Sequence, residues 1–222
     1  MKTTNFMRAA LFGIMAILVT GLVTRAVTSA PKTTPTGVYP VTQAGEGQAV
    51  ATLAAGCFWS VEATFRQIKG VSSAEPGYAG GNAKNPSYQQ VVTGTTGYAE
   101  TVNVIYDPKV VSYATLLRVL MTVNDPTTLN RQGADEGTQY RSAIFYRNEA
   151  QKRIALDEIQ KMNRSRIWKN RVVTQVVPFS NFYRAEDYHL NYYNRNPNLP
   201  YCRVVIAPKL AKFASKFKSI RK

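Results

Sequence analysis

The apolar positions at the start of the folded part predict a buried strand followed by a helix. Residues 49–55 are small and apolar and end at Gly56, which is typical of a buried strand. In residues 58–68 the apolar side chains recur three or four positions apart, which predicts a helix. Cys57 is therefore expected at a strand-to-helix junction.

The middle of the chain alternates between expected loops and regular elements. Residues 70–97 hold too many glycines and prolines for a long element, and we expect a loop with short regular pieces. Residues 100–106 alternate and are rich in β-branched side chains, which predicts a strand, and Ser112 is placed to cap a helix with one apolar face. Residues 124–137 contain glycine and predict another loop.

The pattern after residue 140 predicts two more strands and a helix. Residues 142–146 and 171–179 are the strands, and Asn148 opens the helix, which extends to about Met162. Residues 182–222 show little periodicity and are expected to wrap the domain as an extended tail. Strands that alternate with helices imply a sheet packed against helices on one or both faces, and the chain is too short for an α/β barrel.

Residues 1–30 have the layout of a secretory signal: a short positive start, an apolar run and a small, polar end. The apolar run is shorter than the roughly 20 residues of a spanning helix. Because Pro31 follows the small-residue site, a cleaved signal and an uncleaved membrane anchor both stay open. We expect export to the periplasm or outside the cell, with membrane contact only through residues 1–30. Residues 31–48 predict a flexible linker, which leaves 49–222 as the folded domain.

Composition limits the partners and the metal chemistry. The chain has 28 Lys+Arg against 13 Asp+Glu, a net charge of +15. These charges are scattered except for a basic cluster at 209–222, so nucleic-acid binding is not expected. One histidine, His189, and two cysteines, Cys57 and Cys202, cannot build a metal site of four Cys or His ligands. Neither a metal nor an organic cofactor is expected.

The position of Cys57 favours a nucleophile. At the first turn of a helix, unpaired backbone N–H groups and the helix dipole stabilise a thiolate. Phe58 and Trp59, directly after it, could wall an apolar pocket for a methyl group, or could simply belong to the core. On these residues alone a buried structural cysteine stays open.

Five ordered motifs carry a resemblance to a known family. They are Gly56-Cys57-Phe58-Trp59, Gly77-Tyr78-Ala79-Gly80-Gly81, Asn85-Pro86-Ser87-Tyr88, Ala99-Glu100 and GADEGTQYRS over residues 133–142. From about Thr52 to about Phe213 the chain resembles the A-type peptide methionine sulfoxide reductases. The ordered set is far more specific than any one of its motifs.

The resemblance implies an α+β fold, a two-layer sandwich of a mixed sheet and helices with a ferredoxin-like core, here with the long extended C-terminal tail. It also implies reduction of the S epimer of methionine sulfoxide, with Cys57 as the nucleophile and Glu100 as an acid. Tyr88, Asp135 and Tyr140 would help to bind the sulfoxide oxygen.

The chemistry of the reaction suits these residue types. A thiolate that attacks a sulfoxide sulfur leaves growing negative charge on oxygen, so a protonated carboxyl and phenolic O–H donors should surround that oxygen. Glu100 would need a raised pKa, which burial would provide. Without the resemblance, an exposed acid is preferred for Glu100 and simple packing for Tyr88 and Tyr140. Asp135 could form a loop through backbone hydrogen bonds or order a water near the site.

Tyr98 departs from the family pattern, and Cys202 is the candidate for restoring Cys57 after it is oxidised. Tyr98 stands where histidine is common, which puts the hydrogen bonding around Glu100 in doubt. Cys202 lies in a segment that resembles the one carrying the resolving cysteine, and its neighbours at 196–200 are typical of a mobile loop. With no further distal cysteine, either a Cys57–Cys202 disulfide forms or an external thiol attacks.

The expected protein is thus a monomeric, thiol-dependent oxidoreductase that acts on oxidised proteins or peptides containing methionine sulfoxide, with a thioredoxin-like dithiol protein as the reductant. Two alternatives are a secreted domain stapled by one disulfide, which reduction would unfold, and a basic module that binds nucleic acid or membrane with steep salt dependence. Neither alternative explains the five motifs.

Overall fold

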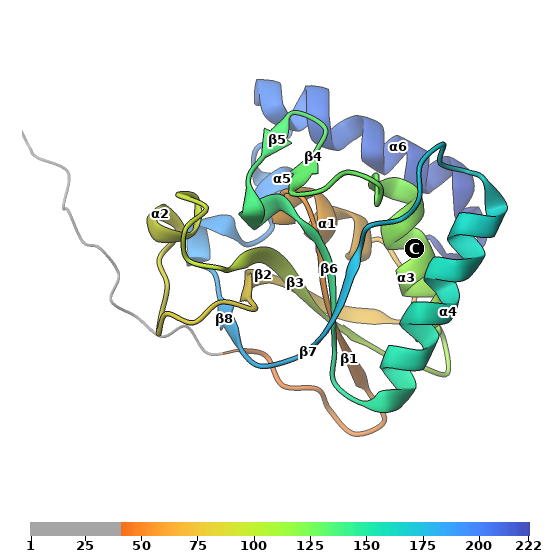
Figure 1. Cartoon of the computed structure of the whole chain (residues 1–222). Coiled ribbons are helices and arrows are strands. Elements are labelled where there is room, and N and C mark those ends of the chain that lie inside the picture. Colours follow the sequence, from red (N-terminus) through yellow and green to blue (C-terminus); the bar gives the residue numbers. More distant parts are fainter. Residues whose placement is uncertain (1–40) are drawn as a thin grey trace, which may run out of the picture. The chain divides into compact units, whose positions relative to one another are not determined.

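The computed structural model describes residues 41–222, and Figure 1 follows the chain through its helices and strands. The predicted signal or anchor, residues 1–30, and residues 31–40 of the predicted linker lie outside the described residues. Within 41–222, no helix is long and apolar enough to cross a membrane.

Six strands form one mixed sheet. They are β1 (Ala49–Ala55), β2 (Val71–Ala79), β3 (Ala99–Tyr106), β6 (Ser142–Tyr146), β7 (Gln175–Pro178) and β8 (Phe182–Arg184). The order across the sheet is β7-β6-β1-β3-β2-β8, and all neighbours are antiparallel except β6 and β7. A helix connects β1 to β2, and β3 lies between these two strands in the sheet. A second helix connects β3 to β6, and β1 lies between those two strands. The predicted α+β fold with a mixed sheet is confirmed.

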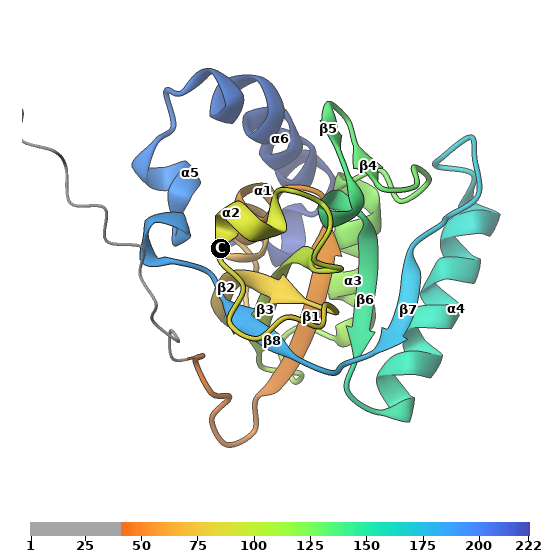
Figure 2. The same cartoon turned by 60° about the vertical axis from the view of Figure 1, so that its left-hand side comes forward.

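The helices cover the sheet. They are α1 (Phe58–Phe65), α2 (Tyr88–Val91), α3 (Tyr113–Val123), α4 (Glu149–Ser165), α5 (Tyr192–Arg195) and α6 (Ala207–Lys216). Helices α1, α3 and α4 contact strands of the sheet, and α6 packs against α1 and α3. Figure 2 shows α3 behind β1 and β6.

The strands alternate between two faces, as the period of a strand requires. In β1, Ala51, Leu53 and Ala55 join the large core between the sheet and the helices, and Ala54 points to a smaller apolar cluster on the other face. In β3, every second residue from Val102 to Tyr106 also faces the helices. Glu100 shares this phase, which places its carboxyl beneath the start of α1.

The two predicted N-cap residues, Ser112 and Asn148, both cap their helices. Ser112 accepts a hydrogen bond from the backbone N–H of Thr115, and Asn148 accepts one from that of Gln151. Helix α3 buries the expected apolar face, and α4 continues to Ser165, slightly beyond the predicted end.

The expectation of a loop with only short regular pieces after residue 70 is wrong for β2. This nine-residue strand contains Pro76 and Gly77, yet it pairs with β3 along its length and with β8 at its end. A Cβ on Gly77 would lie 2.4 Å from the Phe182 ring and from the Tyr183 carbonyl oxygen, so the glycine is what lets β8 approach. Pairing with two strands outweighs the low strand propensity of these residues.

The prediction of an extended C-terminal tail is also wrong. After β8 the chain forms 3₁₀ turns, α5, a π turn at Cys202–Ile206 and α6, and α6 buries Leu210 and Phe213. At the end of the chain, the backbone N–H of Lys222 bonds the Gln67 carbonyl beside α1. The segment is therefore a packed helical layer, because its apolar side chains find a partner face on α1 and α3.

Candidate active site

Cys57 lies at the junction of β1 and α1, as predicted, and is the N-cap residue of α1. The preceding Gly56 has a φ of +79°, and a Cβ there would lie 2.5 Å from the side chain of Gln132. A glycine is needed at this turn, which directs Cys57 into the protein. The thiol is free and only 5% of the residue is exposed.

Burial dominates the electrostatics of Cys57. Desolvation, followed by the negative charge of Glu100, raises the pKa of the thiol far above its usual value. Hydrogen bonds from the Tyr201 hydroxyl and the Trp59 backbone N–H lower this pKa, but by less. The helix start thus favours the thiolate as predicted, but burial, which is not visible in the sequence, outweighs it.

Glu100, at the start of β3, is buried directly beneath the first turn of α1. Its Oε2 accepts a hydrogen bond of 3.0 Å from the Phe58 backbone N–H, and only 1% of the residue is exposed. Desolvation raises the pKa of the carboxyl to about 8, against the lowering by the Phe58 N–H, and the charge of Asp135 adds to the rise. The expected raised pKa is confirmed, and the alternative of an exposed acid is wrong. At pH 7 this carboxyl is mostly protonated and able to donate a proton.

The remaining oxygen-binding candidates come from three short elements. Tyr88 begins α2, Asp135 lies in the strand pair β4 (Arg131–Gln132) and β5 (Asp135–Glu136), and Tyr140 ends the 3₁₀ turn Thr138–Tyr140. Burial raises the pKa values of both phenols, and the charges of Glu100 and Cys57 raise them further. Both hydroxyls therefore remain protonated donors around Glu100 and Cys57.

Tyr201 belongs to this cluster, although nothing in the sequence argument assigned it a role. Its hydroxyl donates its one proton to Asp135 Oδ2 over 2.7 Å, and the same hydroxyl lowers the pKa of the Cys57 thiol. Asp135 therefore orients a hydroxyl that faces the thiol, rather than bonding only its own loop. The available signal was the position of Tyr201 beside Cys202, which alone does not identify a contact with Cys57.

Aromatic side chains surround the first turn of α1. Phe58 is 1% exposed and belongs to the core, whereas Trp59 is partly exposed and stacks on Tyr192 with ring centroids 3.7 Å apart. The Trp59 indole N–H donates to His189 Nδ1 at 3.0 Å. Burial lowers the pKa of His189 to about 4, so this imidazole is neutral at pH 7 and holds Trp59 in place rather than acting as the base for Cys57.

Tyr98, the departure from the family pattern, does not act on Glu100. Its hydroxyl donates to the Ala83 carbonyl, and its ring lies against Gly81, where a Cβ would be 2.4 Å from it. The side chain fastens the loop before β3.

Cys202 is not on a mobile loop, contrary to the expectation. It starts the π turn before α6, is fully buried, and packs with Ala63 of α1 and with Trp59. Desolvation raises the pKa of its thiol. Both cysteines are free thiols, so residues 41–222 contain no disulfide staple.

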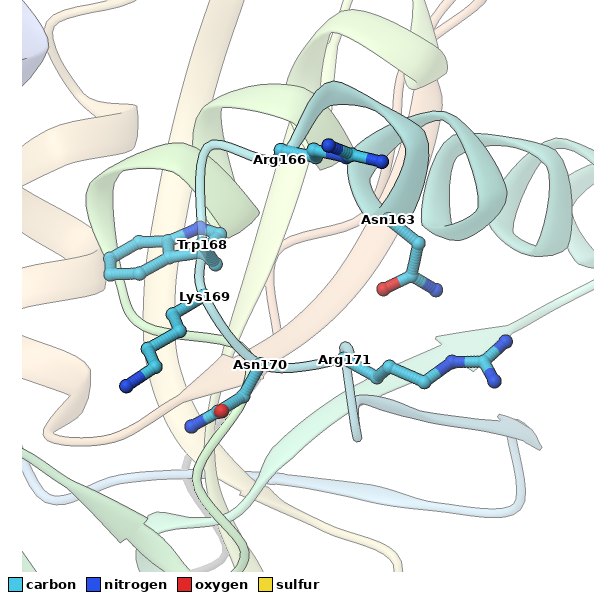
Figure 3. Close-up of a pocket in the computed structure, with 6 residues that line it drawn as sticks. All are labelled: Asn163, Arg166, Trp168, Lys169, Asn170 and Arg171. Atoms are coloured by element: carbon cyan, nitrogen blue, oxygen red, sulfur yellow. The ribbon is translucent and has the colours of Figure 1, made fainter.

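A cavity of about 320 Å³ lies elsewhere, at the end of α4 and along the loop that follows it. Figure 3 shows its lining, which consists of Asn163, Arg166, Trp168, Lys169, Asn170 and Arg171. None of the candidate site residues lines this cavity. In the described part of the chain, no group of three His, Cys, Asp or Glu side chains is placed to hold a metal ion.

Comparisons with known proteins agree with this geometry. Residues 49–221 match the family model described as peptide methionine sulfoxide reductase. The chain is 51% identical over 170 residues to the peptide methionine sulfoxide reductase MsrA of Polynucleobacter asymbioticus, which covers 77% of this chain and 90% of that protein. It is 49% identical over 171 residues to the MsrA of Thermus thermophilus, covering 77% and 96%.

Two solved structures resemble the fold. Mxr1 from Saccharomyces cerevisiae in its reduced form superimposes with a TM-score of 0.66 and 34% identity, covering 72% of this chain and 92% of that one. Methionine sulfoxide reductase A of Corynebacterium diphtheriae does so with a TM-score of 0.62 and 34% identity, covering 69% and 77%.

Proposed function

The chain belongs to the peptide methionine sulfoxide reductase family, and we propose that it reduces the S epimer of methionine sulfoxide, free or in oxidised proteins, through attack of Cys57 on the sulfoxide sulfur. One observation carries the assignment of roles. The thiol of Cys57 and the buried, protonated carboxyl of Glu100 meet at the first turn of α1, where the next backbone N–H holds that carboxyl.

The proposed first step transfers one oxygen atom. The Cys57 sulfur forms a bond to the sulfoxide sulfur while Glu100 donates a proton to the sulfoxide oxygen. The oxygen then passes to Cys57, which becomes a sulfenic acid, and methionine leaves. Methionine sulfoxide gains two electrons and Cys57 loses two. The proton of the original thiol returns to Glu100, so the step is balanced.

Phenolic groups stabilise the oxygen during this step. Tyr88 and Tyr140 keep their protons at neutral pH and lie within electrostatic range of Glu100 and Cys57. The substrate methyl group packs against the partly exposed Trp59, whose orientation the bond to His189 maintains, with Phe58 as the wall behind it. Asp135 acts through the Tyr201 hydroxyl that faces Cys57.

Recycling of Cys57 requires a second thiol. Either Cys202 condenses with the sulfenic acid, releasing water and forming a disulfide, or an external thiol attacks directly. Cys202 is buried, so the first route requires the turn at 202–206 to rearrange. A thioredoxin-like dithiol protein then takes up the oxidising equivalents and restores both thiols.

The deciding experiment supplies the purified protein with the S and R epimers separately, using dithiothreitol as the reductant. Turnover of the S epimer alone is the expected result. Turnover of the R epimer, or of neither, contradicts the proposal.

We also infer a ferredoxin-like core, supported by the strand order β6-β1-β3-β2 and its two helical crossovers. The protein is proposed to be an exported monomer, with residues 1–30 as the address and oxidised envelope or extracellular proteins as substrates. A reporter fused to residues 1–30 should cross the cytoplasmic membrane, and a reporter retained in the cytosol contradicts the export proposal.

A further inference from the structure

Lys209, on the first turns of α6, has a buried ammonium group that the reaction scheme does not use. Its Nζ is shielded from solvent, and no hydrogen-bond acceptor contacts it within residues 41–222. Burying an ammonium without a partner is unfavourable by several kcal/mol. A buried ammonium without a hydrogen bond suggests that a nearby negative charge stabilises it.

The helical register places Lys209 on the same side of the C-terminal segment as Tyr201. Helical backbone continues from Tyr201 through the π turn Cys202–Ile206 into α6. Because a π turn takes more residues than an α turn, eight residues complete about two turns, and Lys209 lies in line with Tyr201. Cys202 and Leu210, also eight apart, pack in the same apolar cluster, as this register requires. Lys209 therefore shares the face of Tyr201, whose hydroxyl donates to Asp135 and lowers the pKa of Cys57.

The charges around Lys209 agree with this placement. Desolvation lowers the pKa of the ammonium, the negative charges of Cys57 and Asp135 raise it, and Lys212 lowers it. The other titratable groups that face Cys57 are acids or phenols: Glu100 from β3, Asp135 from β5, Tyr88 from α2, Tyr140 from the turn before β6, and Tyr201. Lys209 is thus the only cation among these groups, and the two that act on it as negative charges are Cys57 and Asp135.

We propose that the Lys209 ammonium is the counter-charge of the Cys57 thiolate, a positioning residue that acts through Cys57 rather than by touching the sulfoxide. The inference rests on the proposed function only in taking Cys57 as the nucleophile. A buried thiol can attack only if its ionised form is stabilised, and a nearby cation in a poorly solvated site provides that stabilisation. The charge also offsets the repulsion that Asp135 exerts on the thiolate.

The test measures how fast Cys57 is alkylated by iodoacetamide between pH 7 and pH 10, with the Cys57 peptide quantified by mass spectrometry. Lys209→Met keeps the length of the side chain and removes its charge. We expect alkylation to be slower by about tenfold at every pH below the thiol pKa, equivalent to about one unit in the pKa of Cys57. The thermal midpoint should stay the same or rise, because an unpaired buried charge is removed.

The matched control is Lys212→Met, which removes a charge from the same helix. The Lys212 Nζ lies 4.4 Å from the centroid of the Trp168 ring, and this variant should alkylate at the parental rate. Equal rates for Lys209→Met and the parent overturn the proposal, as does equal slowing by both variants. If Lys209→Met does not fold, Lys209→Gln is measured against the same two outcomes. Alkylation needs no sulfoxide, so loss of the proposed reductase activity is detected separately, by the epimer assay on the parent.

Discussion

Glu100→Gln replaces the buried carboxyl by a neutral amide of nearly the same shape. The amide oxygen can still accept the hydrogen bond from the Phe58 N–H, so the start of α1 should keep its geometry. What the variant lacks is a proton that can be donated. It should therefore fold normally and perform the oxygen-transfer step about 10² times more slowly, or worse, the scale of a lost general acid.

The same substitution should make the protein more stable at neutral pH. Burial raises the pKa of Glu100 from 4.5 to about 8. Because the folded protein binds this proton more tightly than the unfolded chain does, the stabilisation is fully present below about pH 4.5 and is lost as the pH rises through about 8. At about 1.4 kcal/mol per pKa unit, the wild type loses on the order of 3 kcal/mol between pH 4.5 and pH 7 from this group. The amide does not ionise and avoids the loss.

The assay is urea unfolding of both proteins at pH 4.5, 7 and 8.5 under reducing conditions, with single-turnover rates measured on the same samples. The unfolding free energies should agree within about 1 kcal/mol at pH 4.5 and differ by about 3 kcal/mol at pH 7, with the variant more stable. Parallel pH dependences would show that Glu100 is not held protonated. A rate within about threefold of wild type would show that the tyrosines or solvent supply the proton.

Three further substitutions test separate parts of the site. Cys202→Ser should still form about one methionine per enzyme in a single turnover but lose most turnover supported by thioredoxin, and unchanged thioredoxin-dependent turnover would make Cys202 structural. Tyr201→Phe should keep the fold but slow alkylation of Cys57 several-fold, since a hydrogen bond that lowers the thiol pKa is removed, and an unchanged alkylation rate contradicts this. Gly56→Ala should reduce the unfolding free energy by about 1–3 kcal/mol in urea titrations, well beyond the effect of Gly133→Ala, where a Cβ meets open space; equal effects would show that the clash is unimportant.

The parts of the fold that sequence reasoning predicted are those with local signals. The strand at residues 49–55 is a short apolar run that ends at a glycine, and the helix after Ser112 has periodic apolar positions, so each pattern determines its own element. Strand β2 has no local sequence pattern that predicts it. Its Pro76 and Gly77 become strand residues only because β3 and β8 pair with them, and the sequence of β2 does not contain that information.

The C-terminal helix is a different case, because a signal was present. Ile206, Leu210 and Phe213 are spaced by four and three residues, which is helical, and all three are buried. Proline, lysine and tyrosine around them hid this short pattern. The composition of this segment is typical of an extended tail, whereas the spacing of its few apolar residues is that of the helix it forms.

Some residues of the candidate site could likewise be predicted from the sequence, and others could not. Cys57 was a candidate from its place at a predictable strand-to-helix junction, whereas Glu100 was identified only through the family resemblance. The direction of the thiol pKa was not predictable, since it depends on how deeply other segments cover Cys57. Tyr201 and Lys209 reach the site only because the C-terminal helical layer packs on α1, a tertiary contact that no local pattern announces.

The most direct test of the central claim is a single turnover of the reduced protein with the S epimer and no reductant, followed by peptide mapping. We expect about one methionine per enzyme, with Cys57 recovered as a sulfenic acid or linked to Cys202. Cys57→Ser should form no methionine, since a hydroxyl lacks the nucleophilicity of a thiolate. Methionine formed by Cys57→Ser, or formed by the wild type while Cys57 stays unmodified, would contradict the claim.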